Sequence, residues 1–316
     1  MKYTIGLLFF TFVISSSVSA AEQPGVRYYG YYNSEGFTSE TADHSNLAFL
    51  NGSPDNERFV QQFHDAINKN MKVMVGASSL FFDGKKLRAD YLSRWSILKT
   101  QIRGLTNHIA AFYVIDEPTR IGASRSDIQA AINEIKSGFP NTPTASIFDT
   151  DHIDGLVNMF DWVGFDCYDN GNSSCDPDAA SRVSSMTRYE GLRGRLDASR
   201  QKMILVPQAA YIYQNHDRDY HRDGMESELV VYHHIAMTDP MVVAAIPFMW
   251  QSGYNSAGQQ DRSGLRDMAT DPNYNHSVNI NLYKDFGRDV SKRASTHYPA
   301  MLSPTNIAIL NTYIAL

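Results

Sequence analysis

The sequence has few cysteines, few clustered basic residues and few long apolar runs. Its 316 residues include two cysteines and carry a formal net charge of -6, with a pI near 5.9. Because phosphate binding needs clustered Lys and Arg, this charge balance argues against a nucleic-acid partner. Hydrophobic residues make up 43% and aromatic residues 12% of the chain, which predicts a globular protein with a substantial core. Disordered and fibrous classes are therefore excluded.

The long apolar run lies at the start of the chain, in "MKYTIGLLFFTFVISSSVSA". One Lys, an apolar stretch over residues 5–14 and small residues ending at Ala20 predict a signal peptide over residues 1–20. A buried N-terminal helix or strand is the alternative. The apolar stretch is too short for a spanning helix, and no later segment is long enough. We therefore expect a secreted or periplasmic protein with no membrane span, whose mature domain covers residues 21–316.

The two cysteines are Cys167 and Cys175, on either side of "YDNGNSS". In an exported protein this spacing favours a disulfide that closes a small loop. Two free thiols, one of them buried in a strand, are the alternative. Two thiols with no nearby His do not predict a metal site.

Eight short apolar stretches recur through the chain, and most are separated by segments of helical character. They cover residues 26–32, 45–51, 72–78, 109–116, 144–149, 161–169, 202–208 and 242–250. Several are almost continuously hydrophobic, which is typical of parallel strands buried on both faces. Apolar spacing of three to four residues predicts helices within 56–70, 91–105, 126–140 and 226–237, and only a stub between the fifth and sixth stretches.

Eight strand–helix units in a chain of this length predict a single-domain (β/α)8 TIM barrel, of the α/β class. A doubly wound open sheet is the competing fold, but it usually has a Gly-rich phosphate turn after its first strand. The segment "YYGYYNSEGF" is not such a turn.

The ends of the eight stretches are polar, acidic and aromatic, and in a barrel the carboxyl ends of the strands face the active site. Aromatic rings stack on the apolar faces of sugars, while carboxylates and amides hydrogen-bond their hydroxyls. This pattern predicts a saccharide site. The candidate catalytic residues are Glu117, Asp116, Asp166 and Asp169, and Asp149 is another acid at a strand end. The candidate substrate-binding residues are Tyr29, Tyr31, Tyr168, Gln208, Tyr211, Trp250 and Gln251.

Glu117 is the candidate general acid/base. Glycoside hydrolysis needs one protonated carboxyl to donate to the leaving oxygen and a second group to support the oxocarbenium-like centre. Burial at the end of an apolar strand and the neighbouring Asp116 carboxylate are both expected to raise the pKa of Glu117. An exposed pair of loop acids before a proline turn is the alternative interpretation of "IDEP".

The fourth stretch, "FYVIDEP", resembles the strand-end Asn-Glu-Pro or Asp-Glu-Pro of the large superfamily of retaining barrel glycosidases. That resemblance implies that Glu117 is the acid/base. The superfamily has a nucleophilic Glu at the end of the seventh strand, whereas "MILVPQAAY" places Gln208 at or near that position. An amide cannot form the glycosyl-enzyme ester, so the resemblance leaves the second catalytic group open.

Two other groups of barrels share features with the chain. The stretch "VGFDCYD" is similar to the Met-x-Tyr-Asp strand of family 18 chitinase-like barrels, and "IPFMWQSG" is similar to their eighth strand. This implies that Tyr168 and Asp169 position a substrate N-acetyl group and that Trp250 floors a subsite, although the Asp-x-Asp-x-Glu motif of that family is absent. The Asp-Glu pair of the fourth stretch is also similar to secreted spherulin-like and polygalactosaminidase barrels.

Other constellations do not complete a site. His233 and His234 have no partner acids at zinc spacing, and the acid-rich segments 149–155 and 169–178 do not match a calcium loop. We expect no metal and no cofactor. The sequence therefore predicts a glycoside hydrolase acting on a polysaccharide or oligosaccharide, with amino-sugar polymers among the candidates. A carbohydrate-binding barrel without catalytic activity is the alternative.

Overall fold

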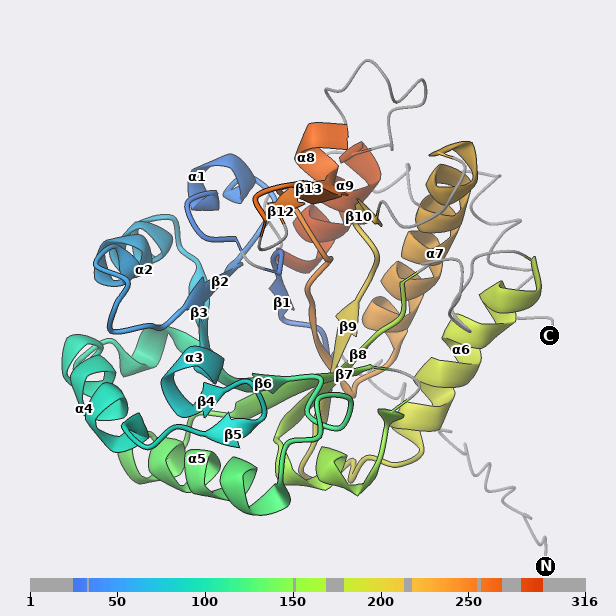
Figure 1. Cartoon of the computed structure of the whole chain (residues 1–316). Helices are drawn as coiled ribbons and strands as arrows, with labels where there is room; N and C mark the ends of the chain where they lie inside the picture. The colour runs from blue at the N-terminus through green and yellow to red at the C-terminus, as the bar shows by residue number, and fades with distance from the viewer. Residues whose placement is uncertain are drawn as a thin grey trace, which may run out of the picture.

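The computed structural model describes residues 25–32, 34–149, 152–168, 179–212, 218–254, 257–268 and 280–291. Within these residues one parallel sheet of eight strands forms the centre of the molecule (Figure 1). Its strands are β1 (Tyr28–Tyr29), β2 (Leu47–Asn51), β3 (Lys72–Gly76), β6 (Ile109–Asp116), β7 (Thr144–Asp149), β8 (Trp162–Asp166), β9 (Lys202–Val206) and β11 (Val242–Ala245). Each lies within one of the eight predicted stretches.

The sheet curves into a nearly closed barrel. Its strand order is β1-β11-β9-β8-β7-β6-β3-β2, so β1 and β2 stand at the two edges. The Asn46 backbone N–H donates to the Tyr29 carbonyl at 2.9 Å, which brings these edges together. At Gly30 a Cβ atom would lie 2.1 Å from the Leu47 carbonyl oxygen, so only glycine permits this approach. The predicted α/β barrel is confirmed.

Helices follow most strands and cover the outside of the barrel (Figure 1). They are α1 (Thr38–Thr41), α2 (Phe59–Asn68), α3 (Ser78–Phe81), α4 (Tyr91–Gln101), α5 (Arg125–Gly138), α6 (Ala179–Arg193), α7 (Arg218–Thr238), α8 (Leu265–Met268) and α9 (Ile280–Ser291). The Ser124 side chain caps α5 by accepting from the Asp127 N–H. Between β7 and β8 the described residues include a short 3-10 turn (Gly155–Met159) in place of a full helix, as the short link predicts.

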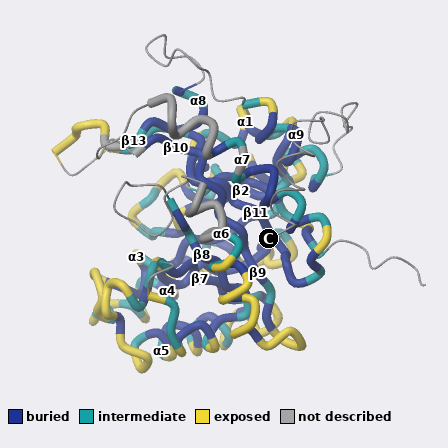
Figure 2. The backbone as a smooth tube through the Cα atoms, turned by 90° about the vertical axis from the view of Figure 1, so that its right-hand side faces the viewer, coloured by how far each residue is buried: buried dark blue, intermediate teal, exposed yellow. Residues whose placement is uncertain are grey.

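The strands are buried on both faces, which explains their continuous hydrophobicity. On β3, Met74 packs inside the barrel, while Val73 and Val75 pack in the layer between sheet and helices. Figure 2 shows the strands as the buried centre of the molecule, with exposed stretches on α4 and α5. The core therefore has an inner and an outer layer, and which layer a side chain enters decides whether it can reach the barrel mouth.

Shorter elements extend the loops between strands and helices. An antiparallel sheet joins β10 (Ala210–Ile212), β13 (Gln260–Gly264) and β12 (Gly253–Tyr254), in that order. A hairpin joins β4 (Phe82–Asp83) to β5 (Lys86–Leu87), and a 3-10 turn (Thr106–His108) precedes β6. The antiparallel sheet connects the segments that follow β9 and β11.

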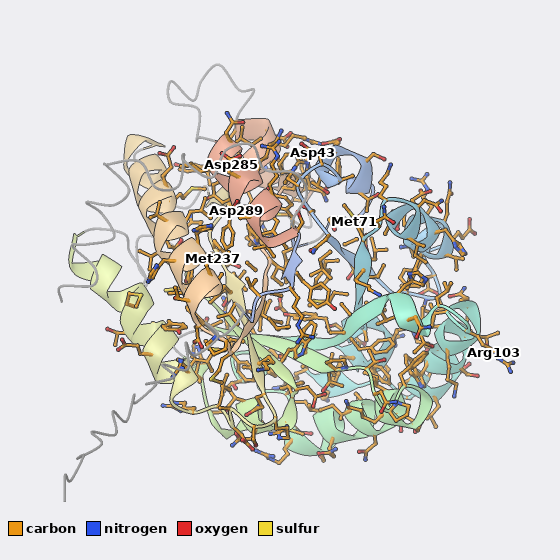
Figure 3. The ribbon with its side chains drawn as sticks, turned by 180° about the vertical axis from the view of Figure 1, so that it is seen from behind. Asp43, Met71, Arg103, Met237, Asp285 and Asp289 are labelled. Atoms are coloured by element: carbon orange, nitrogen blue, oxygen red, sulfur yellow. The ribbon has the colours of Figure 1, made fainter. Side chains whose placement is uncertain are left out.

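Ion pairs fix the helix α9 against its neighbours. Arg288 donates to Asp285 on the same helix and to Asp43 after α1, both at 3.0 Å. His233 of α7 lies 3.0 Å from Asp289 of α9, measured between Nε2 and Oδ2. Figure 3 shows Asp43, Asp285 and Asp289 on one side of the molecule, far from Arg103. No helix in the described ranges is both long and apolar enough to span a membrane.

Candidate active site

Four carboxyl side chains follow one another at the carboxyl ends of three neighbouring strands. Asp116 ends β6, Glu117 comes next, Asp149 ends β7 and Asp166 ends β8. The strand register pairs Asp149 with Asp166, and the Glu117 backbone N–H donates to the Ile147 carbonyl of β7 at 2.9 Å. Parallel pairing therefore brings together three predicted catalytic acids and Asp149, which the sequence marked only as a strand end. The fourth predicted acid, Asp169, lies outside the described residues.

Glu117 has a left-handed backbone, with φ of 41°. This region is uncommon for residues other than glycine and costs free energy. Hydrogen bonds hold the conformation on both sides: the Glu117 N–H donates to Ile147, and its carbonyl accepts from the Ile121 N–H at 3.1 Å. Strained residues of this kind cluster at functional sites. The backbone conformation is thus an independent indication that Glu117 has a functional role.

Arg120 connects the acids of β6 and β7. Its Nη1 lies 3.0 Å from Oε1 and 2.8 Å from Oε2 of Glu117, and its Nε lies 3.6 Å from Oδ2 of Asp149. Asp149 also lies 3.3 Å from Nδ1 of His152. The Glu117 side chain is 18% exposed and that of Arg120 is 56% exposed. The guanidinium therefore covers the solvent side of the Glu117 carboxylate.

Burial and mutual repulsion favour the protonated forms of these acids. Burial raises the pKa of Glu117, and the charges of Asp116 and Asp149 raise it further, against the opposing effect of Arg120. Burial also raises the pKa of Asp166 well above the usual range for aspartate, with added repulsion from Glu117, Asp116 and Asp149. The predicted rise for Glu117 is found. The site can hold a proton on a carboxyl group where an isolated acid would be ionised.

A chain of tyrosine hydroxyls holds Asp116. The Tyr32 hydroxyl donates to that of Tyr113 at 3.3 Å, and the Tyr113 hydroxyl donates to Oδ1 of Asp116. Burial of the carboxyl raises the pKa of Asp116, while the bonds from Tyr113 and Tyr32 lower it. Asp116 is nevertheless exposed on its open side. The tyrosine hydroxyls thus favour the charged form of Asp116 against the effect of burial, which leaves its pKa raised.

Aromatic rings lie beside the acids. Tyr168 stacks on Phe248 with centroids 5.0 Å apart, and Tyr32 stacks on Phe49 at 4.7 Å. Burial raises the pKa of Tyr168, and the charge of Asp166 raises it further. Tyr168 is the predicted substrate-binding aromatic that the structure brings to the acids.

Sequence reasoning missed Tyr32, Tyr113 and Phe248 as members of the site. Tyr32 stood in the same stretch as the chosen Tyr29 and Tyr31, and its signal was Gly30, which marks where β1 meets β2. No local pattern indicated Tyr113, because residues three apart on a regular strand point to opposite faces; the register shift between Tyr113 and Ile115 turns Tyr113 and Asp116 to the same face.

The prediction that Tyr29 and Tyr31 contact substrate is wrong. Both are buried in the outer layer, and the Tyr29 hydroxyl donates to the Tyr283 carbonyl of α9 at 2.7 Å. The Tyr31 hydroxyl lies 3.2 Å from Nε2 of His44. Because side chains alternate along the extended segment and Tyr29 and Tyr31 face the helices, the inward-facing tyrosines are Tyr28 and Tyr32.

Trp250 and Tyr211 are also corrected, because they too are buried in the outer layer, with 3% and 6% of their surface exposed. The Trp250 indole N–H donates to Oε2 of Glu40 at 2.9 Å. Strand β11 ends at Ala245, so the alternation of an extended strand stops before Trp250. Phe248 is the aromatic residue of this segment that packs inside the barrel.

The two predicted amides have different surroundings. Gln208 is 3% exposed and its side-chain amide donates to the Ala210 carbonyl at 3.0 Å. Its backbone N–H donates to Oε2 of Glu228 on α7 at 3.3 Å. Gln251 is partly exposed, and its backbone packs closely against Gly264 of β13.

The remaining candidates concern sulfur and metal. Cys167 is buried directly after β8, while Cys175 lies outside the described residues, as does the whole acid-rich segment 169–178. The disulfide therefore stays a prediction. Among the side chains that the structure describes, no group of three or more His, Cys, Asp and Glu is arranged to hold a metal ion.

No family model and no curated protein sequence matches the chain. The chain does match solved structures. A β-galacturonidase of family GH2 from Eisenbergiella tayi, bound to galacturonate, has a TM-score of 0.54 at 12% identity over 78% of this chain and 45% of its own. An FMN-binding β-glucuronidase from Facaelibacterium prausnitzii L2-6 has a TM-score of 0.54 at 12% identity over 85% of this chain and 44% of its own.

A third structure matches over nearly its full length. Native xylanase 10B from Thermotoga maritima has a TM-score of 0.51 at 13% identity, over 87% of this chain and 98% of its own. This chain thus spans less than half the length of the two glycuronidases but almost all of the xylanase. All three neighbours are named as glycoside hydrolases. At these identities the likeness establishes that the chain has the barrel fold that they share.

Proposed function

We propose that the protein is an exported glycoside hydrolase that cleaves glycosidic bonds of a polysaccharide, with Glu117 as the general acid/base. The observation that carries this proposal is the position of Glu117: a left-handed residue at a barrel strand end, buried beside the carboxyl groups of Asp116 and Asp149, which favour its protonation. The glycoside hydrolase neighbours add support at the level of the fold.

The proposed reaction begins with a proton on Glu117. The carboxyl donates this proton to the glycosidic oxygen as the bond from that oxygen to the anomeric carbon breaks, and positive charge develops on the sugar ring. A water molecule then bonds to the anomeric carbon and gives one proton to a carboxylate of the site, which completes the hydrolysis. The Tyr113 hydroxyl donates to Asp116 and opposes the rise in its pKa that burial causes, so that Asp116 in its ionised form would stabilise that charge. Asp166 is the other candidate for the second group, and its raised pKa suits a carboxyl that exchanges a proton. Asp169 remains a sequence-based candidate.

The surroundings of the acids suit a sugar polymer. Tyr32, Tyr168 and Phe248 provide aromatic surfaces of the kind that stack on pyranose rings. The acids outnumber the basic groups that contact them, Arg120 and His152. An excess of acidic groups favours neutral or cationic substrates over anionic ones, and this supports amino-sugar polymers among the candidates.

Replacement of Glu117 tests the proposal. The Glu117→Gln protein is expected to release reducing ends from its polysaccharide at least about a hundredfold more slowly, because an amide cannot donate the proton. Glu57→Gln, at an exposed position outside the site, is the matched control and should keep the activity of the unmodified protein. If Glu117→Gln hydrolyses at the unmodified rate, Glu117 is not the acid.

One observation favours a carbohydrate-binding protein without catalysis. Gln208, near the end of β9, is an amide where retaining barrel enzymes have a carboxylate nucleophile, and its side chain is buried against Ala210. A binding protein would migrate more slowly in a gel that contains its polysaccharide, as affinity electrophoresis measures. It would release no reducing ends from any member of a broad panel. Hydrolysis of one panel member would reject this alternative.

Export is proposed from residues 1–20 and from the paired cysteines. The expected product in the periplasm or medium begins at residue 21, and its intact mass is two hydrogens below that of the reduced chain. Mass spectrometry before and after reduction measures both. A chain that retains residues 1–20 or carries two titratable thiols would contradict the proposal.

A further inference from the structure

We propose that Arg120 is the positioning residue of this site: it holds the Glu117 carboxylate across the gap between the ends of β6 and β7 and releases it when a substrate binds. The kinetic part of this inference rests on the proposed function. The contacts that carry it do not, because they belong to the free protein.

Arg120 contacts Glu117 in a way that fixes the carboxyl group. Its Nη1 lies within 3.0 Å of both carboxylate oxygens, so neither oxygen is left to rotate away from the guanidinium. The backbone of Glu117 is fixed as well, by its bonds to Ile147 and Ile121. The carboxyl therefore has a defined place before any substrate arrives, which is the condition for efficient proton transfer.

A second acid is within reach of the same guanidinium. Nε of Arg120 lies 3.6 Å from Oδ2 of Asp149, and the other oxygen of Asp149 faces His152 at 3.3 Å. The Arg120 side chain is 56% exposed, so it can move without disturbing the core. When Glu117 takes up a proton and turns to a substrate, Asp149 is ready to keep the guanidinium paired. The site thus contains both the Arg120 guanidinium, which holds Glu117, and the Asp149 carboxylate, which can pair with that guanidinium when Glu117 leaves it.

The charge on Glu117 is set by groups from several elements. Repulsion from neighbouring acids raises the pKa of Glu117, and Arg120 lowers it. The titratable or charged groups that interact with Glu117 are Asp116 on β6, Arg120 in the following loop, Asp149 on β7, and Asp166 and Tyr168 at the end of β8. Arg120 is the cation in this set. Its removal must therefore raise the pKa of Glu117.

The kinetic test compares three arginine variants. Arg120→Gln removes the charge, and Arg120→Lys keeps it without the planar fork. Arg125→Gln removes a nearby arginine that donates to the Gly155 carbonyl at 2.9 Å. If Glu117 must be protonated, Arg120→Gln should move the alkaline limb of kcat/KM to higher pH. The ratio of kcat/KM at pH 8 to that at pH 6 should rise about two- to fivefold, as for an exposed ion pair.

Arg120→Lys should lie between the unmodified protein and Arg120→Gln, and Arg125→Gln should match the unmodified protein. If kcat/KM of Arg120→Gln is lowered by the same factor at every pH and its alkaline limb does not move, Arg120 has a structural role only. An equal shift in Arg125→Gln would also overturn the proposal.

A second test needs no catalysis. Because the pKa of Glu117 is raised in the folded state, its ionisation destabilises the fold as pH rises from about 4, the unfolded range, through the raised folded value. In Arg120→Gln this loss of stability should be larger: the rise of the unfolding constant from pH 4 to pH 8 should exceed that of the unmodified protein by about two- to fivefold. The enlargement should vanish when Glu117→Gln is also present. If it persists in the double variant, Arg120 does not act through Glu117, whether or not the protein hydrolyses sugars.

Discussion

Trp250 is expected to support the barrel from outside and to make no contact with substrate. Its indole is 3% exposed, packs on Tyr31 with centroids 4.9 Å apart and donates to Glu40. Trp250→Ala would leave a large cavity and cost about 3–5 kcal/mol, a large share of the ~5–15 kcal/mol that stabilises a typical domain. Trp250→Phe keeps a ring and is the better probe.

The cost of Trp250→Phe follows from two losses. The hydrogen bond to the partly exposed Glu40 carboxylate is worth about 1 kcal/mol, and the smaller ring gives up about another 1 kcal/mol of packing. A loss of about 2 kcal/mol raises the unfolding constant roughly 30-fold. Urea unfolding measures it, and a Glu40→Ala background should reduce it by the share of the hydrogen bond.

Substrate kinetics distinguish this role from that of Phe248. Phe248→Ala removes the ring that stacks on Tyr168 beside the acids and should raise KM, whereas Trp250→Phe should leave KM unchanged. A Trp250→Phe protein with a raised KM and an unchanged urea midpoint would refute the placement of Trp250 in the outer layer.

Two further predictions concern the acids. Tyr113→Phe removes a donor that lowers the pKa of Asp116, so that pKa should rise further. The free energy of unfolding at neutral pH should fall by about 0.5–1.5 kcal/mol, a modest loss because Asp116 is exposed. NMR titration of the carboxyl checks this, and an unchanged pKa would contradict it. Asp166→Asn should flatten the loss of stability from pH 4 to pH 8, because the folded protein retains a proton on Asp166 that the unfolded chain has lost. Urea unfolding across this range measures how steeply the free energy of unfolding falls with pH. An unchanged slope in Asp166→Asn would contradict the prediction.

The sequence predicted the barrel well because burial on both faces of parallel strands leaves a direct signal. All eight strands lie within the predicted stretches, and α5 (Arg125–Gly138) coincides closely with the helix predicted within 126–140. These features depend on local residue order. The acids at the ends of β6 and β8 were predicted for the same reason, since each follows its own apolar run.

The aromatic residues were predicted less well because their orientation depends on neighbours that are distant in sequence. Tyr29 faces α9, more than 250 residues away along the chain, whereas Tyr32 faces the inside of the barrel with the alternate residue Tyr28. Trp250 follows the end of β11, where strand alternation no longer applies. The role of Arg120 was missed because its partner Asp149 belongs to another strand, so no local motif joins them.

The antiparallel sheet of β10, β13 and β12 has a consequence for motion. It pairs Tyr211 with Ser263 and Gly253 with Arg262, so the segments after β9 and β11 share backbone hydrogen bonds. The guanidinium of Arg262 also lies 5.6 Å from the centre of the Phe248 ring. The segments that follow β9 and β11 are therefore expected to move together as one unit. Any opening that admits a polymer on this side of the mouth would have to lift both loops together and would disturb the Phe248–Tyr168 stack beside the acids.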